Sequence, residues 1–118
     1  MINTIFGIKA HLTQVWDVSG QRLPITKIRV APLTVTQVKS TATDGYQAIQ
    51  FGIGAKKCAK ITRPLQGHLK NSFPSAASSK QAARFLREVR INDDAELKAG
   101  DKITASQVFQ PGDIVNAT

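Results

Sequence analysis

Residues 34–57 constrain the fold more than any other part of the chain, because two β-rich runs there flank a strong turn signal. The runs, residues 33–39 and 46–53, are rich in Val, Ile, Thr, Tyr and Phe, which strands favour. Between them, Asp44 and Gly45 suit a turn that needs a positive φ. We therefore expect an antiparallel β-hairpin with a connection of about five or six residues.

The second run of this hairpin has one apolar face. Ile49, Phe51 and Ile53 alternate with Ala, Gln and Gly, and this period of two predicts a half-buried strand. Directly after the run, Lys56 and Lys57 open the most basic part of the chain. We therefore expect a cluster of positive charge directly after the second strand of the hairpin.

Two further strands are predicted before the hairpin. The apolar run 12–16 ends at residues 17–20, where Asp and Gly suit a type I turn. In residues 23–30 the apolar positions change phase, which either a β-bulge near residues 26–27 or burial of both strand faces would explain. The first half therefore predicts four antiparallel strands.

The middle of the chain changes character. Pro64 suits the first position of a helix, and apolar residues recur at helical spacing until Pro74 ends the pattern. Residues 75–83 are small and polar and predict a loop or a frayed helical turn. Residues 82–90 fit either a strand with mixed faces or a helix, and propensity does not separate the two.

The last quarter contains an acidic loop, residues 92–96, and two turn signals. Each turn, at residues 98–101 and 110–113, ends in Gly-Asp and precedes a short apolar run. We expect strands at residues 103–106 and 114–115.

Net charge points to a polyanionic partner. The formal net charge is +8 and the isoelectric point about 10.1. Residues 56–90 hold nine Lys and Arg against one acid, net +8; residues 1–55 hold five against two, net +3; residues 91–118 hold two against five, net −3. Nucleic acid is the first expectation, an anionic membrane the second, and an ordinary solvated surface the plainest alternative.

Signatures of enzymes and of export are missing from the sequence. His11, His68 and Cys58 are too far apart for a local metal site, and no acid–base pair or complete phosphate-binding glycine loop occurs. We expect no enzyme, cofactor, metal or small-molecule substrate; a small barrel enzyme that binds a phosphorylated cofactor is the least favoured reading. A single cysteine, no targeting segment and no long apolar run favour a cytoplasmic protein without a membrane contact.

The cations after the hairpin form a candidate binding surface. Phosphate recognition uses cations on flexible stems, exposed backbone N–H groups and few neighbouring acids, and this segment combines all three. Aromatic residues are few here, and Phe73 and Phe85 suit a core better than base stacking, so contact with phosphates and shape is favoured over base readout. Gly67 would allow close backbone approach. The candidate RNA-binding residues are Lys9, Lys56, Lys57, Lys60, Arg63, Gly67, His68, Lys70, Arg87 and Arg90.

Several motifs together resemble a known family. They are Gly7-Ile8-Lys9, residues 12–16 and 23–26, VTQVK at 35–39, DGYQAIQFGIGAKK at 44–57, RPLQGH at 63–68, residues 88–90 and residues 111–115. In this order and spacing they resemble the N-terminal portion of the bacterial large-subunit ribosomal protein L three family (universal name uL three). The resemblance spans essentially the whole chain.

The resemblance implies a mainly β fold: a small antiparallel barrel of the type found in the second domain of translation factors, with one short helix, as a single domain over residues 1–118. It implies a structural constituent of the large ribosomal subunit, in the cytoplasm, that binds ribosomal RNA, contacts other large-subunit proteins and supports assembly. By family position, Lys9 and several of the cations after the hairpin would face RNA. A free-standing nucleic-acid-binding barrel outside the ribosome is the alternative.

Two departures from the family pattern matter. His11-Leu12 stands where the family usually has Gly-Met, a local change. The family continues beyond the segment that ends at Thr118 into a Gly/Lys-rich extension and then into strands that complete the barrel. We therefore expect an incomplete barrel, an open strand edge and self-association through that edge.

Overall fold

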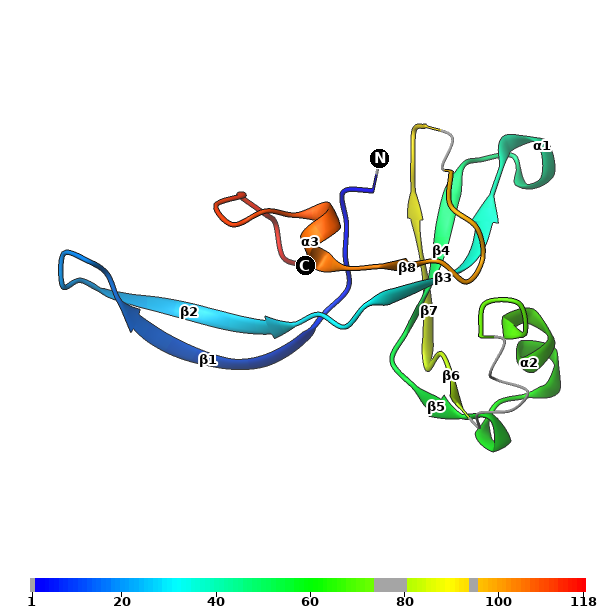
Figure 1. Cartoon of the computed structure of the whole chain (residues 1–118), viewed down its shortest axis with the longest axis horizontal. Coiled ribbons are helices and arrows are strands. Elements are labelled where there is room, and N and C mark those ends of the chain that lie inside the picture. The colour runs from blue at the N-terminus through cyan, green and yellow to red at the C-terminus, as the bar shows by residue number, and fades with distance from the viewer. Residues whose placement is uncertain (1, 74–80, 94–95) are drawn as a thin grey trace.

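The computed structural model describes residues 2–73, 81–93 and 96–118, which form three antiparallel sheets (Figure 1). In chain order the elements are β1 Ile8–Trp16, β2 Arg22–Arg29, β3 Leu33–Lys39, α1 Thr41–Asp44, β4 Ala48–Ile53, β5 Lys56–Lys57, the 3-10 turn η1 Cys58–Lys60, α2 Arg63–Leu69, β6 Gln81–Ala82, β7 Phe85–Arg90, β8 Lys102–Ile103 and α3 Ala105–Val108. A mainly β, antiparallel fold is confirmed. The sheets do not close into a barrel within the described residues, and these contain three short α-helices where one was expected.

The expected hairpin is confirmed as the centre of the largest sheet. This sheet has the strand order β7-β4-β3-β8, so β3 and β4 are its two inner strands. The connection is more ordered than a plain loop, because α1 forms a single helical turn within it. Gly45 ends that turn in the left-handed region, with φ 78°, and its N–H donates to the carbonyl of Thr41 at 3.1 Å. A side chain at this φ would be strained, which explains the glycine of the turn signal.

Both faces of β4 are covered, whereas the alternation predicted one buried face. Ile49 and Phe51 are fully buried on the first face, against a cluster that includes Val35 and Val89. Ala48 and Gly52 on the second face are also buried. The alternation shows which residues share a face but not that a second layer covers the small ones.

The second layer is the unit formed by β5, η1, α2 and β6, here called the α2 unit. The helix expected from residue 63 is confirmed as α2, which begins with Pro at its first turn and ends at Leu69, 1% exposed. Leu69 packs with Ile61 and Ala83, and Phe73 joins this second cluster. The α2 unit therefore has a small core of its own.

Residues 82–90 form strand and not helix: Ala82 ends β6, residues 83–84 are irregular, and β7 runs from Phe85 to Arg90. It pairs with β4 at six consecutive positions, from Ala48 opposite Arg90 to Ile53 opposite Phe85. Partner strands of this kind override weak helix propensity. Of the loop expected at residues 75–83, residues 75–80 lie outside the described part, and β6 follows.

Strands β1 and β2 form a two-stranded arm that projects from the sheet (Figure 1). Both readings of the phase change in residues 23–30 are wrong. The arm's side chains are mostly exposed, and the irregularity lies in β1 between Lys9 and His11, opposite Ile28 and Lys27. The arm explains the radius of gyration of 17.2 Å, against about 13.5 Å for a compact chain of this length. Both arm edges lack a further strand among the described residues, and self-association through them stays a prediction.

The two Gly-Asp turns are confirmed; of the strands expected after them, the first is shortened to β8 and the second does not form. In each turn the Asp carboxylate accepts from the first residue's N–H at 2.8 Å, Asp101 from Lys98 and Asp113 from Gln110. The first turn leads to β8, only two residues long, because a capping box of Thr104 and Gln107 starts α3. Residues 114–115 are irregular. Of the acidic loop at 92–96, residues 94–95 are outside the described part.

Candidate nucleic-acid interface

The α2 unit carries most of the predicted binding residues. Lys56 and Lys57 form β5, Lys60 ends η1, and Arg63, Gly67 and His68 lie on α2, with Lys70 directly after it. All seven are exposed. The unit is closed by pairing of β5 with β6, which sets Lys56 opposite Ala82. Cations distant in sequence are thereby held on one small, folded element.

Two pockets on the α2 unit bring these cations together. A pocket of about 310 Å³ is lined by Arg63, Gly67 and Lys70, together with Cys58 and Leu69. A smaller one of about 110 Å³ is lined by three cations, Lys56, Lys60 and Arg84, around an apolar floor. Neither lining contains an acid. Such surfaces suit anionic groups that reach between flexible cations.

Arg84 is the member of this surface that the candidate set missed. It precedes β7, and its N–H donates to the carbonyl of Ile53 at 3.0 Å, which holds this corner against the exit of the hairpin. The charge count over residues 56–90 included Arg84, but nothing in the sequence brought it next to Lys56. Arg84 comes next to Lys56 because the chain returns alongside β4 as strand β7.

His68 is positioned by the sheet rather than left free. Its Nε2 lies 2.8 Å from Oε1 of Gln50, which also accepts from the Thr36 hydroxyl at 2.9 Å. Since that oxygen is an acceptor, Nε2 carries the proton and donates. His68 therefore links α2 to β4 and helps to hold the α2 unit against the sheet.

Three predicted residues lie apart from the α2 unit. Arg87 is opposite Phe51 and Arg90 opposite Ala48, so the two arginines occupy opposite faces of β7. The Arg90 guanidinium stands 5.1 Å from the ring centre of Tyr46, next to the ion pair described below. Lys9 lies on the arm. The structure thus divides the candidate set into a gathered group on the α2 unit and three cations outside it, of which Arg87 shares the Phe85 ring with Arg84.

A polar network ties the outer end of the sheet together. Lys39 Nζ lies 2.8 Å from Glu88 Oε2 and donates to the Tyr46 hydroxyl at 2.9 Å, and that hydroxyl donates to Glu88 Oε1 at 2.9 Å. The hydrogen bond from Lys39, and then the one from Tyr46, hold the pKa of Glu88 below its usual value. Glu88, the single acid of residues 56–90, is therefore paired with Lys39, which lies outside that segment.

This network predicts a pH dependence of stability. With the folded pKa of Glu88 lowered, the unfolded chain binds more protons, so the contribution is present above the unfolded pKa of about 4.3 and lost as the pH falls below it. The melting temperature of the wild type should fall more steeply than that of Glu88→Gln below about pH 4.3. The difference should be small, because the pair is partly exposed. If the melting temperatures of the two proteins fell equally with pH across this range, Glu88 would not be the source of the pH dependence.

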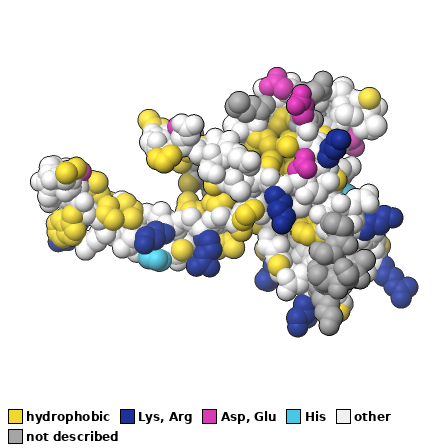
Figure 2. All heavy atoms as spheres, viewed as in Figure 1, with side chains coloured by type: hydrophobic (Ala, Val, Ile, Leu, Met, Phe, Trp, Pro, Cys, Tyr) yellow, Lys and Arg dark blue, Asp and Glu magenta, His cyan; other side chains and the backbone are white. Residues whose placement is uncertain are grey.

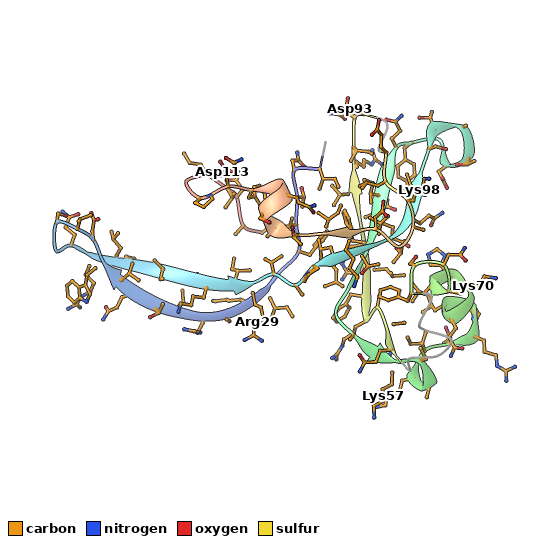
Figure 3. All side chains as sticks on the ribbon, in the orientation of Figure 1. Arg29, Lys57, Lys70, Asp93, Lys98 and Asp113 are labelled. Atoms are coloured by element: carbon orange, nitrogen blue, oxygen red, sulfur yellow. The ribbon has the colours of Figure 1, made fainter. Side chains whose placement is uncertain are left out.

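Acidic and basic side chains gather on different sides of the molecule. In the view of Figure 2, most Asp and Glu side chains lie in the upper half of the molecule and most Lys and Arg side chains in the lower half, although some Lys or Arg lie beside the acids in the body. Figure 3 labels Asp93 and Asp113 on the upper side and Lys57 at the bottom. The acidic C-terminal residues shown there thus point away from the α2 unit, which leaves its positive field uncompensated.

Other types of site find no support in the part of the chain that the structure describes. Residues 2–73, 81–93 and 96–118 contain no group of three or more His, Cys, Asp or Glu side chains that could hold a metal ion. In the same residues, no helix is long and apolar enough to span a bilayer.

No protein-family model matches the chain, but curated ribosomal proteins do. Large ribosomal subunit protein uL3 of Syntrophotalea carbinolica is 38% identical over 118 residues, 100% of this chain and 53% of that protein. The uL3 protein of Roseiflexus sp. is 40% identical over 116 residues, 98% of this chain and 51% of its own length. The uL3 protein of Nostoc punctiforme is 42% identical over 112 residues, which is 95% of this chain and 50% of that protein. The resemblance seen in the motifs is confirmed, and the chain spans about half the length of the curated relatives it matches.

Proposed function

This chain is homologous to the large ribosomal subunit protein uL3 over about half of that protein's length, and from that premise we propose that it binds ribosomal RNA as a structural part of the large subunit. The α2 unit is the RNA-binding surface. The protein acts without catalysis, cofactor or small-molecule substrate, at the ribosome in the cytoplasm, and other large-subunit proteins are its neighbours. Residues 1–118 act as one unit in this role.

The gathered cations of the α2 unit carry this proposal. Lys56, Lys60 and Arg84 surround one pocket, Arg63 and Lys70 line the other, and both linings are free of acids. These side chains are exposed and end in donors on flexible stems, so they can follow phosphate oxygens without a fixed geometry. RNA presents such oxygens at close, regular spacing.

Contact with phosphates and shape is favoured over base readout. The described aromatic residues of the α2 unit are limited to Phe73, which packs in its core. Phe85 is exposed, but the guanidinium carbons of Arg84 and Arg87 lie 5.6 and 5.9 Å from its ring centre and compete with a base for its surface. With so few aromatic residues, stacking on unpaired bases is weak, and the surface suits a structured RNA.

Charge reversal in the α2 unit tests the proposal. If the surface neutralises about five phosphates, affinity for duplex-rich RNA should fall with log salt at a slope of roughly −4 to −5. Changing Lys56, Lys57 and Arg63 together to Glu should weaken binding at least about ten-fold and flatten the slope by about 3, similarly for all RNA sequences. Filter binding at several salt concentrations measures both quantities.

The matched control is a pair of double variants. Lys56→Glu with Lys57→Glu and Lys98→Glu with Lys102→Glu remove equal charge, but Figure 3 places Lys98 on the acidic side of the molecule, away from Lys57. Equal losses from the two pairs would mean that only net charge matters, and would overturn the proposed surface. Failure of the protein to sediment with large subunits, with RNA binding intact, would favour a free-standing nucleic-acid-binding module.

A further inference from the structure

The arm carries a basic cluster of its own at the end where it joins the sheet. Lys27 and Arg29 lie two positions apart on β2, and their side chains therefore share a face. His11 is directly opposite Lys27 in β1 and belongs to the same face. The irregularity at residue 10 sets Lys9 opposite Ile28, so that Lys9 extends from the other face.

These cations have no acidic partner in the described structure. Lys9, Lys27 and Arg29 are exposed, and none forms an ion pair or side-chain hydrogen bond with a described residue. The acid of the arm, Asp17, is in the turn at the opposite end. Its carboxylate accepts from the N–H of Val18 at 2.7 Å and from the Ser19 hydroxyl at 3.3 Å. Asp113 lines a pocket with Ile28 and Val30, on the other face of the ribbon from Lys27 and Arg29. On their own face, Lys27 and Arg29 are therefore free to bind an anion.

The cluster lies on the same side of the molecule as the α2 unit. Figure 2 shows Lys and Arg side chains along the lower side, from the arm to the body. Arg29 and Lys57 both point to that side in Figure 3, while Asp113 and Asp93 are on the other. The long axis of the molecule, 54 Å, runs along the arm and into the body. One elongated polyanion can therefore touch both basic regions at once.

We infer that the base of the arm is a second RNA contact, in which Lys27 and Arg29 bind phosphates of the same RNA segment that occupies the α2 unit. This inference rests on the proposed function and adds the shape of the partner: a continuous RNA helix long enough to reach from the α2 unit to the arm. A two-stranded ribbon is narrow, and the wide, shallow minor groove of an RNA helix exposes phosphates on both of its rims.

A membrane surface fits this cluster less well. Exposed apolar residues are spread along the arm and are not gathered at the cluster: Val18 is at the far tip, Trp16 is close to it, and Ile8 and Leu12, each 67% exposed, lie further along β1 toward the base. The guanidinium carbon of Arg22 lies 5.0 Å from the ring centre of Trp16. Lys27 and Arg29 are at the opposite end of β2 from that tip. Insertion of the tip into a bilayer would carry the cluster away from the headgroups, whereas an RNA lying along the lower side meets it directly.

Titration with two RNAs of different length distinguishes the contact at the arm from the contact at the α2 unit. The double variant Lys27→Gln with Arg29→Gln is compared with Lys98→Gln with Lys102→Gln, which removes equal charge from another surface. Each is titrated with a duplex of about 16 base pairs, the span that double-stranded RNA-binding domains cover, and with a capped hairpin of about six base pairs. Two lost phosphate contacts should weaken binding of the long duplex roughly five- to ten-fold at 150 mM salt and flatten its salt slope by about 1.5 to 2. Binding of the short hairpin should not change.

The outcomes distinguish this inference from the proposed function. If Lys56→Glu with Lys57→Glu weakens binding of both RNAs while the arm variant matches its control on both, the arm contact is overturned and the proposed function stands. Equal effects of the arm variant on the two lengths would also overturn it. Wild-type protein that binds neither RNA overturns both proposals. Loss of binding to phosphatidylserine vesicles in the arm variant, with RNA binding unchanged, would assign the cluster to a membrane instead.

Discussion

Replacing Phe51 with alanine should lower the free energy of unfolding by about 3–5 kcal/mol, the range measured for large aromatic residues removed from cores. Phe51 is fully buried on the inner strand β4, and its ring centre is 6.4 Å from that of Phe6. The vacated volume is walled by both neighbouring strands, β3 and β7, which pair along β4 and cannot collapse into it. Urea denaturation followed by circular dichroism measures the loss.

Phe85→Ala is the matched control, because it removes the same side chain from the neighbouring strand at an exposed position. Phe85 is 50% exposed, and its loss should cost less than about 1 kcal/mol. Should Phe51→Ala be unfolded in buffer, Phe51→Leu gives a smaller, measurable loss of about 1–2 kcal/mol. A Phe51→Leu protein as stable as the wild type would show that this face is not the main core.

Replacing Gly52 with valine should be nearly as damaging, for the opposite reason. A Cβ atom at this position would lie 2.8 Å from Cβ of Ala83 and 3.2 Å from the Phe73 ring, so even one added carbon overpacks the contact between β4 and the α2 unit. Overpacking costs typically 1–3 kcal/mol and occasionally more. Because the α2 unit must move to make room, RNA affinity should fall together with stability. Denaturation and RNA titration of the same variant measure both.

Gly67→Ala is the control for Gly52→Val. Gly67 lies on α2, where an added Cβ would meet no heavy atom within 4 Å outside its own helix backbone and chain neighbours, and alanine is the better helix former by about 0.5–1 kcal/mol. This variant should be at least as stable as the wild type. If Gly52→Val leaves stability and RNA affinity unchanged, the α2 unit does not depend on its packing against the sheet. If Gly67→Ala weakens RNA binding while it raises stability, the backbone at Gly67 approaches the RNA closely.

The candidate site was predictable as a segment but not as a surface. Charge counts along the chain identify residues 56–90, because unlike charges are usually interspersed on a protein surface. They do not show that Arg84 meets Lys56 and Lys60, that Arg87 and Arg90 occupy opposite faces, or that His68 bonds to Gln50. The meeting of Arg84 with Lys56 and Lys60, and the strand that separates Arg87 from Arg90, depend on β7 returning beside β4. The bond from His68 to Gln50 depends on α2 packing against β4. Both are long-range contacts with no local signal.

Local chemistry by itself determined the elements with strong short-range signals. The hairpin of residues 33–53, the Pro-initiated helix and the two Gly-Asp turns follow from strand-forming residues, a fixed φ and side chains that cap their own backbone. Where two short-range preferences competed, the sequence stayed ambiguous. The capping box at Thr104 turned an expected strand into α3, and pairing with β4 made residues 85–90 a strand.

Only the tertiary structure decided which surfaces are covered. The alternation in β4 predicted one buried face, but the α2 unit buries Gly52 on the other, because a position without a side chain lets a second layer approach. Strands β1 and β2 have the composition of a sheet core, yet they project as an exposed arm, since strand propensity describes a backbone and not what packs against it. That projection sets Arg29 on the same side as the α2 unit, and Lys27 shares the face of Arg29. The spacing of these residues along the chain does not predict this arrangement.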